Sequence, residues 1–172
     1  WEDDSVYKNY DIVHFHRAIP KRVGNQVRQT YLEESFRILD KLKSLGIVTV
    51  MDLDDYWAPT KEHPAYQLMV RENLPHKIKE NLKRADFITT TTPIFAEEIR
   101  KYNKNVIVLP NAIDPSEKQF TPKKEETDKD LRFGWLGGSS HFHDLKLMSG
   151  GVSQFLNTYK DRTQFVLCGF DT

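Results

Sequence analysis

Short apolar runs alternate with longer segments of helical periodicity along most of this chain, and this alternation constrains the fold more than any other feature. The runs Ile12–His16, Ile47–Leu53, Phe87–Thr90 and Val106–Leu109 are rich in β-branched residues and predict buried strands. Because a helical segment returns the chain to the same edge each time, these strands must pair in parallel. Strands that are apolar on both faces predict an α/β fold, with a parallel sheet covered by helices.

The segments between the runs carry the start and stop signals of helices. Apolar residues between 27 and 45 follow the helical period, and Gly46 directly after them predicts the helix C-terminus. Pro75 fits the first turn of a second helix. Thr92 and Pro93 predict the start of a third, with the threonine as the N-cap and the proline at the first helical position. The polar stretch 54–72 predicts a long loop or a short helix.

The composition changes abruptly over residues 115–130, which are almost wholly charged or turn-forming and predict a linker. The alternation then restarts, with strands expected at Leu131–Leu136 and Phe165–Gly169 and a helix that includes Val152–Tyr159. The sequence therefore predicts two α/β parts, residues 1–114 and 131–172, joined by the linker.

The charge balance and the cysteine content exclude several classes of protein. Lys plus Arg (25) equals Asp plus Glu (25), so no basic field attracts nucleic acid and no polybasic block marks a membrane anchor. No apolar run approaches the ~20 residues that span a bilayer. Cys168 is the only cysteine, which excludes an internal disulfide and makes the cytosol the expected compartment.

Polar residues follow each apolar run directly. In an open parallel sheet, ligands bind beyond the carboxyl ends of the strands. We therefore expect one shared polar rim, built from His14, His16, Arg17, Asp52, Asp54, Asp55, residues 89–92, Asn111, Asp114, Gly137, Gly138, Ser139, Ser140 and His141.

Two histidines on the first strand allow more than one interpretation. His14 and His16 are two residues apart and point to the same face. Either His14 is a core histidine and His16 ends the strand, or the pair forms a metal site with Asp52 and Asp54, as in a metal-dependent hydrolase. In a third interpretation, the acidic residues cap a helix or bond backbone amides, with Tyr56 and Trp57 packed under the loop. An Asp-x-Asp of this kind also fits a divalent cation held against a nucleotide diphosphate.

The segment FGWLGGSSHFHDL predicts a strand, a glycine loop and a helix start. Gly137 and Gly138 allow the backbone to approach a ligand, and the amides of a helix start attract phosphate. Ser139 and Ser140 add hydroxyl donors or a helix cap, and His141 is a donor to a phosphate oxygen. The alternative is a strand-to-helix turn that needs glycine only for its dihedral angles.

Taken together, these segments resemble glycosyltransferases of the GT-B fold, in the large group of nucleotide-sugar enzymes. YDIVHFH resembles the Asp-hydrophobic-hydrophobic-His-x-His strand of that family. VIVLPNAID resembles its Pro-Asn-Gly-hydrophobic-Asp motif, with Ala112 in place of the usual glycine. LRFGWLGGSSHFHDLKLM and TQFVLCGF resemble the first strand, donor loop and second strand of its C-terminal domain, and ADFITTTTPIFAEEI the strand and helix before the Pro-Asn motif.

The resemblance implies two Rossmann-like domains, with the acceptor on residues 1–114 and the nucleotide-sugar donor on residues 131–172. It places His16 in the cleft near the transferred sugar as the catalytic residue. It implies no metal, and no cofactor other than the nucleotide-sugar, which is a substrate. The donor-binding residues it implies are Gly137, Gly138, Ser139, Ser140 and His141, and the cleft residues are Arg17, Asp52, Asp54, Asn111 and Asp114.

The chain departs from the family pattern at the diphosphate. Gly138 occupies the position of the family's arginine, and Asp144 lies about where its lysine is expected, so that Ser139, Ser140, His141 and His143 are the local substitutes. The family's first strands and its acidic pair would lie before Trp1 and after Thr172. We therefore expect a piece of a larger enzyme, incomplete at both ends and inactive alone.

The expected function is metal-independent transfer of a sugar from a nucleotide donor to a glycan or lipid-linked acceptor, as in polysaccharide biosynthesis. The expected location is the cytoplasm, including the inner face of the membrane for a peripheral enzyme with a lipid-linked acceptor. The metal-dependent hydrolase and a non-catalytic nucleotide-sugar-binding module remain alternatives. The donor, the acceptor, the stereochemistry and the oligomeric state are left open.

Overall fold

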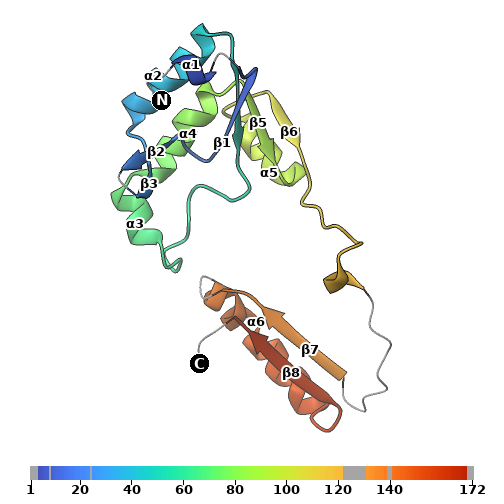
Figure 1. Cartoon of the computed structure of the whole chain (residues 1–172). Coiled ribbons are helices and arrows are strands. Elements are labelled where there is room, and N and C mark those ends of the chain that lie inside the picture. The colour runs from blue at the N-terminus through green and yellow to red at the C-terminus, as the bar shows by residue number, and fades with distance from the viewer. Residues whose placement is uncertain (1–3, 8, 24, 122–130, 139–140, 170–172) are drawn as a thin grey trace. The chain divides into compact units, whose positions relative to one another are not determined.

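The computed structural model describes residues 4–7, 9–23, 25–121, 131–138 and 141–169. The chain divides into two compact units. The first unit is Trp1–Ala58 with Leu68–Ala112, and the second is Pro59–Gln67 with Ile113–Thr172. Figure 1 shows the order of the elements along the chain.

A four-stranded parallel sheet forms the centre of the first unit. Its strand order is β1 (Ile12–His16), β4 (Val48–Asp52), β5 (Phe87–Thr90), β6 (Val106–Val108). All neighbouring pairs are parallel, so the α/β prediction is confirmed for this sheet. The register places His16 beside Asp52 and Asp52 beside Thr89, which brings the carboxyl ends of three strands to one edge.

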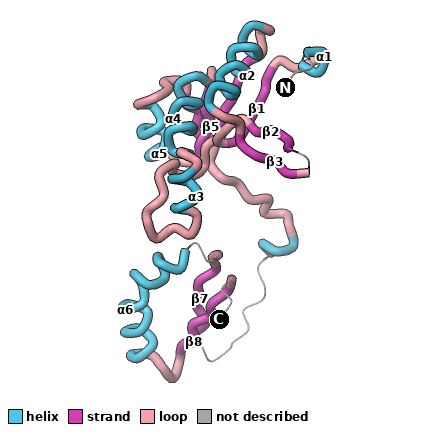
Figure 2. The backbone as a smooth tube through the Cα atoms, turned by 90° about the vertical axis from the view of Figure 1, so that its left-hand side faces the viewer, coloured by secondary structure: helices cyan, strands magenta, loops and turns pink. Residues whose placement is uncertain are grey.

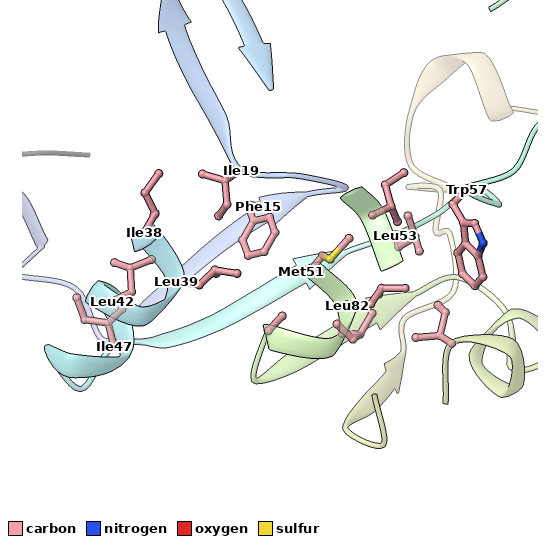
Figure 3. Packing of buried hydrophobic residues seen from close by; sticks show 14 residues of the cluster. Phe15, Ile19, Ile38, Leu39, Leu42, Ile47, Met51, Leu53, Trp57 and Leu82 are labelled. Atoms are coloured by element: carbon pink, nitrogen blue, oxygen red, sulfur yellow. The ribbon is translucent and has the colours of Figure 1, made fainter. Parts of the chain in front are cut away.

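Three helices pack on one face of this sheet, α2 (Leu32–Ser44), α4 (Leu74–Arg84) and α5 (Pro93–Arg100) (Figure 2). Alternate residues of the strands point toward them, including Phe15, Met51 and Ile88. Burial of these side chains is the main source of stability in the unit, at about 1.5–3 kcal/mol for each large one. Together they form one core (Figure 3), which contains Phe15, Ile19, Ile38, Leu39, Leu42, Ile47, Met51, Leu53, Trp57, Ile78, Leu82, Ala85, Ile88 and Ile99.

The opposite face of the sheet is exposed in the described part of the chain. Ile12, Phe87 and Ile107 on that face are 57%, 39% and 47% exposed, and His14 beside them is exposed as well. The expectation of a sheet covered by helices therefore holds for one face of the described residues only. The exposed face carries polar residues as well, since the register places His16, Asp52 and Thr89 side by side on it.

The predicted helix signals of the first unit are confirmed. The hydroxyl oxygen of Thr92 accepts a hydrogen bond from Phe95 N at 3.2 Å, and Pro93 follows as the first residue of α5. Pro75 lies in the first turn of α4. Gly46 ends α2 with a left-handed φ of 76°, a conformation that side chains other than hydrogen disfavour.

The prediction of helix from residue 27 onward is wrong, because Gln26–Gln29 forms a strand of a hairpin. Strand β2 (Pro20–Val23) pairs antiparallel with β3 (Gln26–Gln29), and α2 begins only at Leu32. Buried Thr30 fixes the return of the hairpin, since its N and its Oγ1 both donate to Ile19 O at 3.0 Å. Cross-strand pairing of this kind overrides the local helical period. Two short helices also lie in this half of the sequence, α1 (Asp4–Tyr7) and α3 (Tyr66–Arg71), the latter within the stretch predicted as loop or short helix.

The second unit contains a βαβ motif. Strand β7 (Leu131–Leu136) pairs in parallel with β8 (Thr163–Cys168), and α6 (Phe142–Thr158) connects them. A short 3-10 helix, η1 (Lys118–Phe120), lies in the predicted linker, and residues 122–130 of that linker lie outside the described residues. Phe133 of β7 contacts Phe155 of α6 and Phe165 of β8, with ring centroids 5.2 and 5.1 Å apart. None of the described helices is long and apolar enough to cross a membrane.

Candidate functional site

The candidate site of the first unit begins where β1 ends. Arg17 follows the last residue of β1 with φ of 60°, the left-handed region that non-glycine residues rarely adopt. Its backbone N donates to Asp52 O at 3.0 Å, so the chain turns across the end of β4. Backbone conformations of this kind cost about 1–3 kcal/mol and gather at functional sites.

Three side chains meet at this turn, and we call His16, Arg17 and Asp54 the rim cluster. His16 Nε2 lies 2.9 Å from Asp54 Oδ1, and Arg17 Nη2 donates to the same oxygen at 3.1 Å. Arg17 also forms an ion pair with Asp55. The side chain of His16 is 51% exposed and that of Asp54 46%, so the cluster is open to a ligand. The predicted gathering of these rim residues is thus seen at the ends of β1 and β4.

The charges of the rim cluster keep Asp54 ionised. The hydrogen bond from His16, and after it the hydrogen bond and charge of Arg17, lower the pKa of Asp54 from 3.8 to about 2, against the opposing effect of partial burial. At neutral pH the carboxylate is therefore a permanent acceptor for both partners.

The neighbouring acidic residue, Asp52, has a different environment. Its Oδ1 accepts a hydrogen bond from Thr89 Oγ1 at 2.6 Å, across the β4–β5 pair. The Asp52 carboxylate is therefore hydrogen-bonded to the neighbouring strand, whereas the Asp54 carboxylate is hydrogen-bonded to His16. The sequence placed Thr89 and Asp55 on the rim but not among the site residues, and only the strand register pairs them with Asp52 and Arg17.

The interpretation of His14 as a core histidine is wrong, because its side chain lies on the exposed face of the sheet. In the ranges that the structure describes, no group of three or more His, Cys, Asp or Glu side chains is placed to hold a metal ion. His14, His16, Asp52 and Asp54 are therefore not gathered into a metal-binding set in this arrangement. Asp52 and Asp54 each bond a different partner instead.

The aromatic residues after the acidic run support the loop from below. Trp57 is 3% exposed and stacks on Tyr56, with ring centroids 4.7 Å apart. It also meets Tyr102 edge to face at 5.5 Å. The predicted packing under the loop is confirmed for Trp57, while Tyr56 covers it from outside and is 54% exposed.

Asn111 does not join the rim cluster, and Asp114 has local partners in the second unit. Asn111 is exposed beyond the end of β6, the far edge of the sheet from β1. Asp114 belongs to the second unit, and its Oδ1 accepts hydrogen bonds from Ser116 N and Oγ at 2.9 and 2.6 Å. Those two bonds lower the pKa of Asp114, so its carboxylate serves a local turn.

Close packing explains why residue 137, in the glycine loop of the second unit, is a glycine. A Cβ atom there would lie 2.7 Å from Trp135 Nε1, and one on Gly169 would lie 2.4 Å from the Gly137 carbonyl oxygen. This close approach favours the interpretation of a turn that requires glycine, without opposing a ligand role. Gly138 O accepts a hydrogen bond from His141 N at 3.0 Å, and the predicted site residues Ser139 and Ser140 lie outside the described residues.

Both histidines at the start of α6 bind the same carboxylate. His141 Nδ1 lies 2.9 Å from Asp144 Oδ2, and His143 Nε2 lies 3.1 Å from Asp144 Oδ1. Asp144 therefore compensates the charge of any imidazolium formed here. The sequence spacing by itself predicts the His141–Asp144 pair, because residues three apart lie next to each other on a helix surface.

Comparisons of the chain with protein-family models, with curated proteins and with solved structures find no match. The geometry of the site and the sequence motifs are therefore the only indications of function for this chain.

Proposed function

We propose that this chain is part of a GT-B-type glycosyltransferase that transfers a sugar from a nucleotide-sugar to a glycan or lipid-linked acceptor. The observation that carries the proposal is the rim cluster of His16, Arg17 and Asp54 at the carboxyl edge of a parallel sheet. In sheets of this type, that edge is where substrates bind.

The chemistry of the cluster suits a sugar substrate. Sugars and glycan acceptors present hydroxyl groups, which both donate and accept hydrogen bonds. A half-exposed imidazole that donates to an ionised carboxylate leaves its other ring nitrogen as an acceptor for such a hydroxyl and as a site for a proton, at the last residue of the strand.

The glycine loop between β7 and α6 suits the donor side. Backbone amides at the start of a long helix favour a diphosphate. His141 and His143 each bond Asp144 through one ring nitrogen, so that their other nitrogen donates to a phosphate oxygen only when the ring is protonated. In the proposed enzyme, Gly137, Gly138 and His141 lie by the leaving diphosphate, as the resemblance implies.

Turnover by the full-length protein tests the proposal. We expect transfer or hydrolysis of a UDP-, GDP- or dTDP-sugar without added metal, and we expect His16→Ala to reduce turnover at least 10²-fold with little loss of stability. His14→Ala is the matched control, because His14 lies on the same exposed face of β1 outside the cluster. An unchanged rate in His16→Ala, or an equal loss in both variants, removes His16 from the mechanism.

The two alternatives are separated by simpler measurements. Stoichiometric zinc, manganese or iron in the purified protein would favour the hydrolase. Binding of nucleotide diphosphates in a titration, without turnover of any nucleotide-sugar, would favour the non-catalytic binding module.

A further inference from the structure

The carboxylate of Asp54 decides which ring nitrogen of His16 carries a proton. Its Oδ1 lies 2.9 Å from His16 Nε2 and 3.1 Å from Arg17 Nη2. An ionised carboxylate only accepts hydrogen bonds, and a guanidinium only donates them. His16 Nε2 must therefore be the donor in this contact.

The other ring nitrogen remains available to a ligand. Within the described ranges, Nδ1 of His16 has no hydrogen-bond partner, and the side chain is 51% exposed. When Nε2 of a neutral imidazole carries the proton, Nδ1 carries the lone pair and acts as an acceptor. A substrate hydroxyl is the group that such an acceptor would bind.

We propose that Asp54 is a positioning residue that holds His16 with Nε2 protonated, so that Nδ1 accepts a hydrogen bond from a substrate hydroxyl. The identity of that hydroxyl rests on the proposed function, as part of either the transferred sugar or the acceptor. The placement of the proton rests on the contacts of Asp54 alone.

Arg17 holds the carboxylate in place for this role. Its backbone is fixed by the bond to Asp52 O, and its guanidinium spans Asp54 and Asp55. Its Nε is buried without a hydrogen-bond partner among the described residues, and its φ is positive. The unpaired Nε and the positive φ are both unfavourable, so Arg17 keeps this conformation only because its partners, Asp54 among them, hold it. The position of Asp54 is therefore well determined.

The chain offers a matched control for the test. Asp55 is the next residue and bonds Arg17, as Asp54 does, but only Asp54 bonds His16. Asp54→Ala therefore releases both the histidine and one arginine contact, while Asp55→Ala releases an arginine contact alone.

Kinetics of the full-length protein form the first arm of the test. We expect Asp54→Ala to lower kcat on the order of 10²-fold with little change in the KM of the donor, partial recovery in Asp54→Glu, and near-normal kcat in Asp55→Ala. A loss confined to transfer, with donor hydrolysis intact, assigns the hydroxyl to the acceptor, and a loss in both reactions assigns it to the donor sugar. Equal losses in the two alanine variants, or an effect on KM alone, would overturn the proposal.

Nitrogen-15 NMR of the His16 ring forms the second arm and needs no substrate. In the neutral ring we expect the proton on Nε2, protected from exchange in the wild type and in Asp55→Ala, and exposed to exchange in Asp54→Ala. A proton on Nδ1 in the wild type, or unchanged protection in Asp54→Ala, contradicts the proposal. Because this arm is independent of turnover, it remains decisive even if no nucleotide-sugar is a substrate.

Discussion

The two units of this chain each contain a parallel βαβ motif, and the two motifs differ sharply in burial. In β4–α4–β5, the side chains of Met51, Leu82 and Ile88 are fully buried. In β7–α6–β8, the helix has no buried residue, and Leu136 at the end of β7 is 85% exposed.

The difference lies in the neighbours of the strands rather than in the motifs themselves. β4 and β5 are the central strands of a four-stranded sheet, covered on one face by helices, whereas β7 and β8 pair only with each other in the described residues. A βαβ motif can therefore form its local structure with few buried side chains. A core requires further strands and helices packed around it.

The largest expected effect comes from emptying the buried core of the first unit. Leu82→Ala removes a side chain with no exposed area and should destabilise this unit by about 2–5 kcal/mol, through lost transfer free energy and a cavity. Leu147→Ala on α6 changes a residue that is 85% exposed and should cost less than about 0.5 kcal/mol.

Hydrogen exchange measures both effects, on the amides of β4 and β5 for the first variant and of β7 and β8 for the second. Equal losses of protection would break the comparison, since they would mean that α6 supports its strands as α4 does.

A smaller loss of stability is expected from removing a hydrogen bond at the start of the last strand of each motif. Asp86 Oδ2 accepts hydrogen bonds from buried Thr49, from its N at 2.8 Å and its Oγ1 at 2.7 Å. Asp86→Ala leaves that N–H without its carboxylate acceptor and should cost about 1–3 kcal/mol in urea unfolding. The exposed bond from Thr163 Oγ1 to Tyr159 O is the counterpart in the second unit, and Thr163→Ala should cost less than about 1 kcal/mol. A larger cost for Thr163→Ala than for Asp86→Ala would reverse the comparison.

The smallest effect is a pH dependence that belongs to the first unit. The pKa of Asp54 is about 2 in the folded state and 3.8 in its ordinary environment, so the folded state binds this proton less readily. The resulting stability is present above about pH 4 and is lost as the pH falls toward about 2. Because the side chain is 46% exposed, solvent screening limits it to under about 1 kcal/mol.

Urea unfolding of the wild type and of Asp54→Asn at pH 5 and at pH 2.5 tests this sign. We expect the variant to be the less stable protein at pH 5 and the difference to shrink at pH 2.5. A difference that grows on acidification would show that the ion pairs of Asp54 do not stabilise the fold.

The sequence predicted the strands of the first sheet and the starts of α4 and α5 well. Proline, threonine and glycine act on their own segment of backbone, so their signals survive in any tertiary context. The prediction of helix over residues 27–31 was wrong for the opposite reason. Pairing with Pro20–Val23 makes Gln26–Gln29 a strand, and helical periodicity carries no information about such a partner.

The candidate site was predicted in part. The rim residues at the ends of β1 and β4 follow from the rule that ligands bind at the carboxyl edge, and His16, Arg17 and Asp54 do meet there. Asn111 satisfied the same rule in sequence but lies beyond the end of β6, at the far edge of the sheet from β1, because the order of the strands in the sheet is not visible in the chain.

The sequence by itself determined the alternation of strands and helices, because period, propensity and capping are properties of neighbouring residues. Tertiary structure alone decided that, among the described residues, one face of the sheet is exposed with His14 on it, that Asp52 bonds Thr89, and that Asp54 bonds His16. Residues 16 and 54 are 38 positions apart, and their contact depends on the strand register and on the left-handed turn at Arg17. Such contacts arise from the pairing of distant segments, which no local pattern encodes.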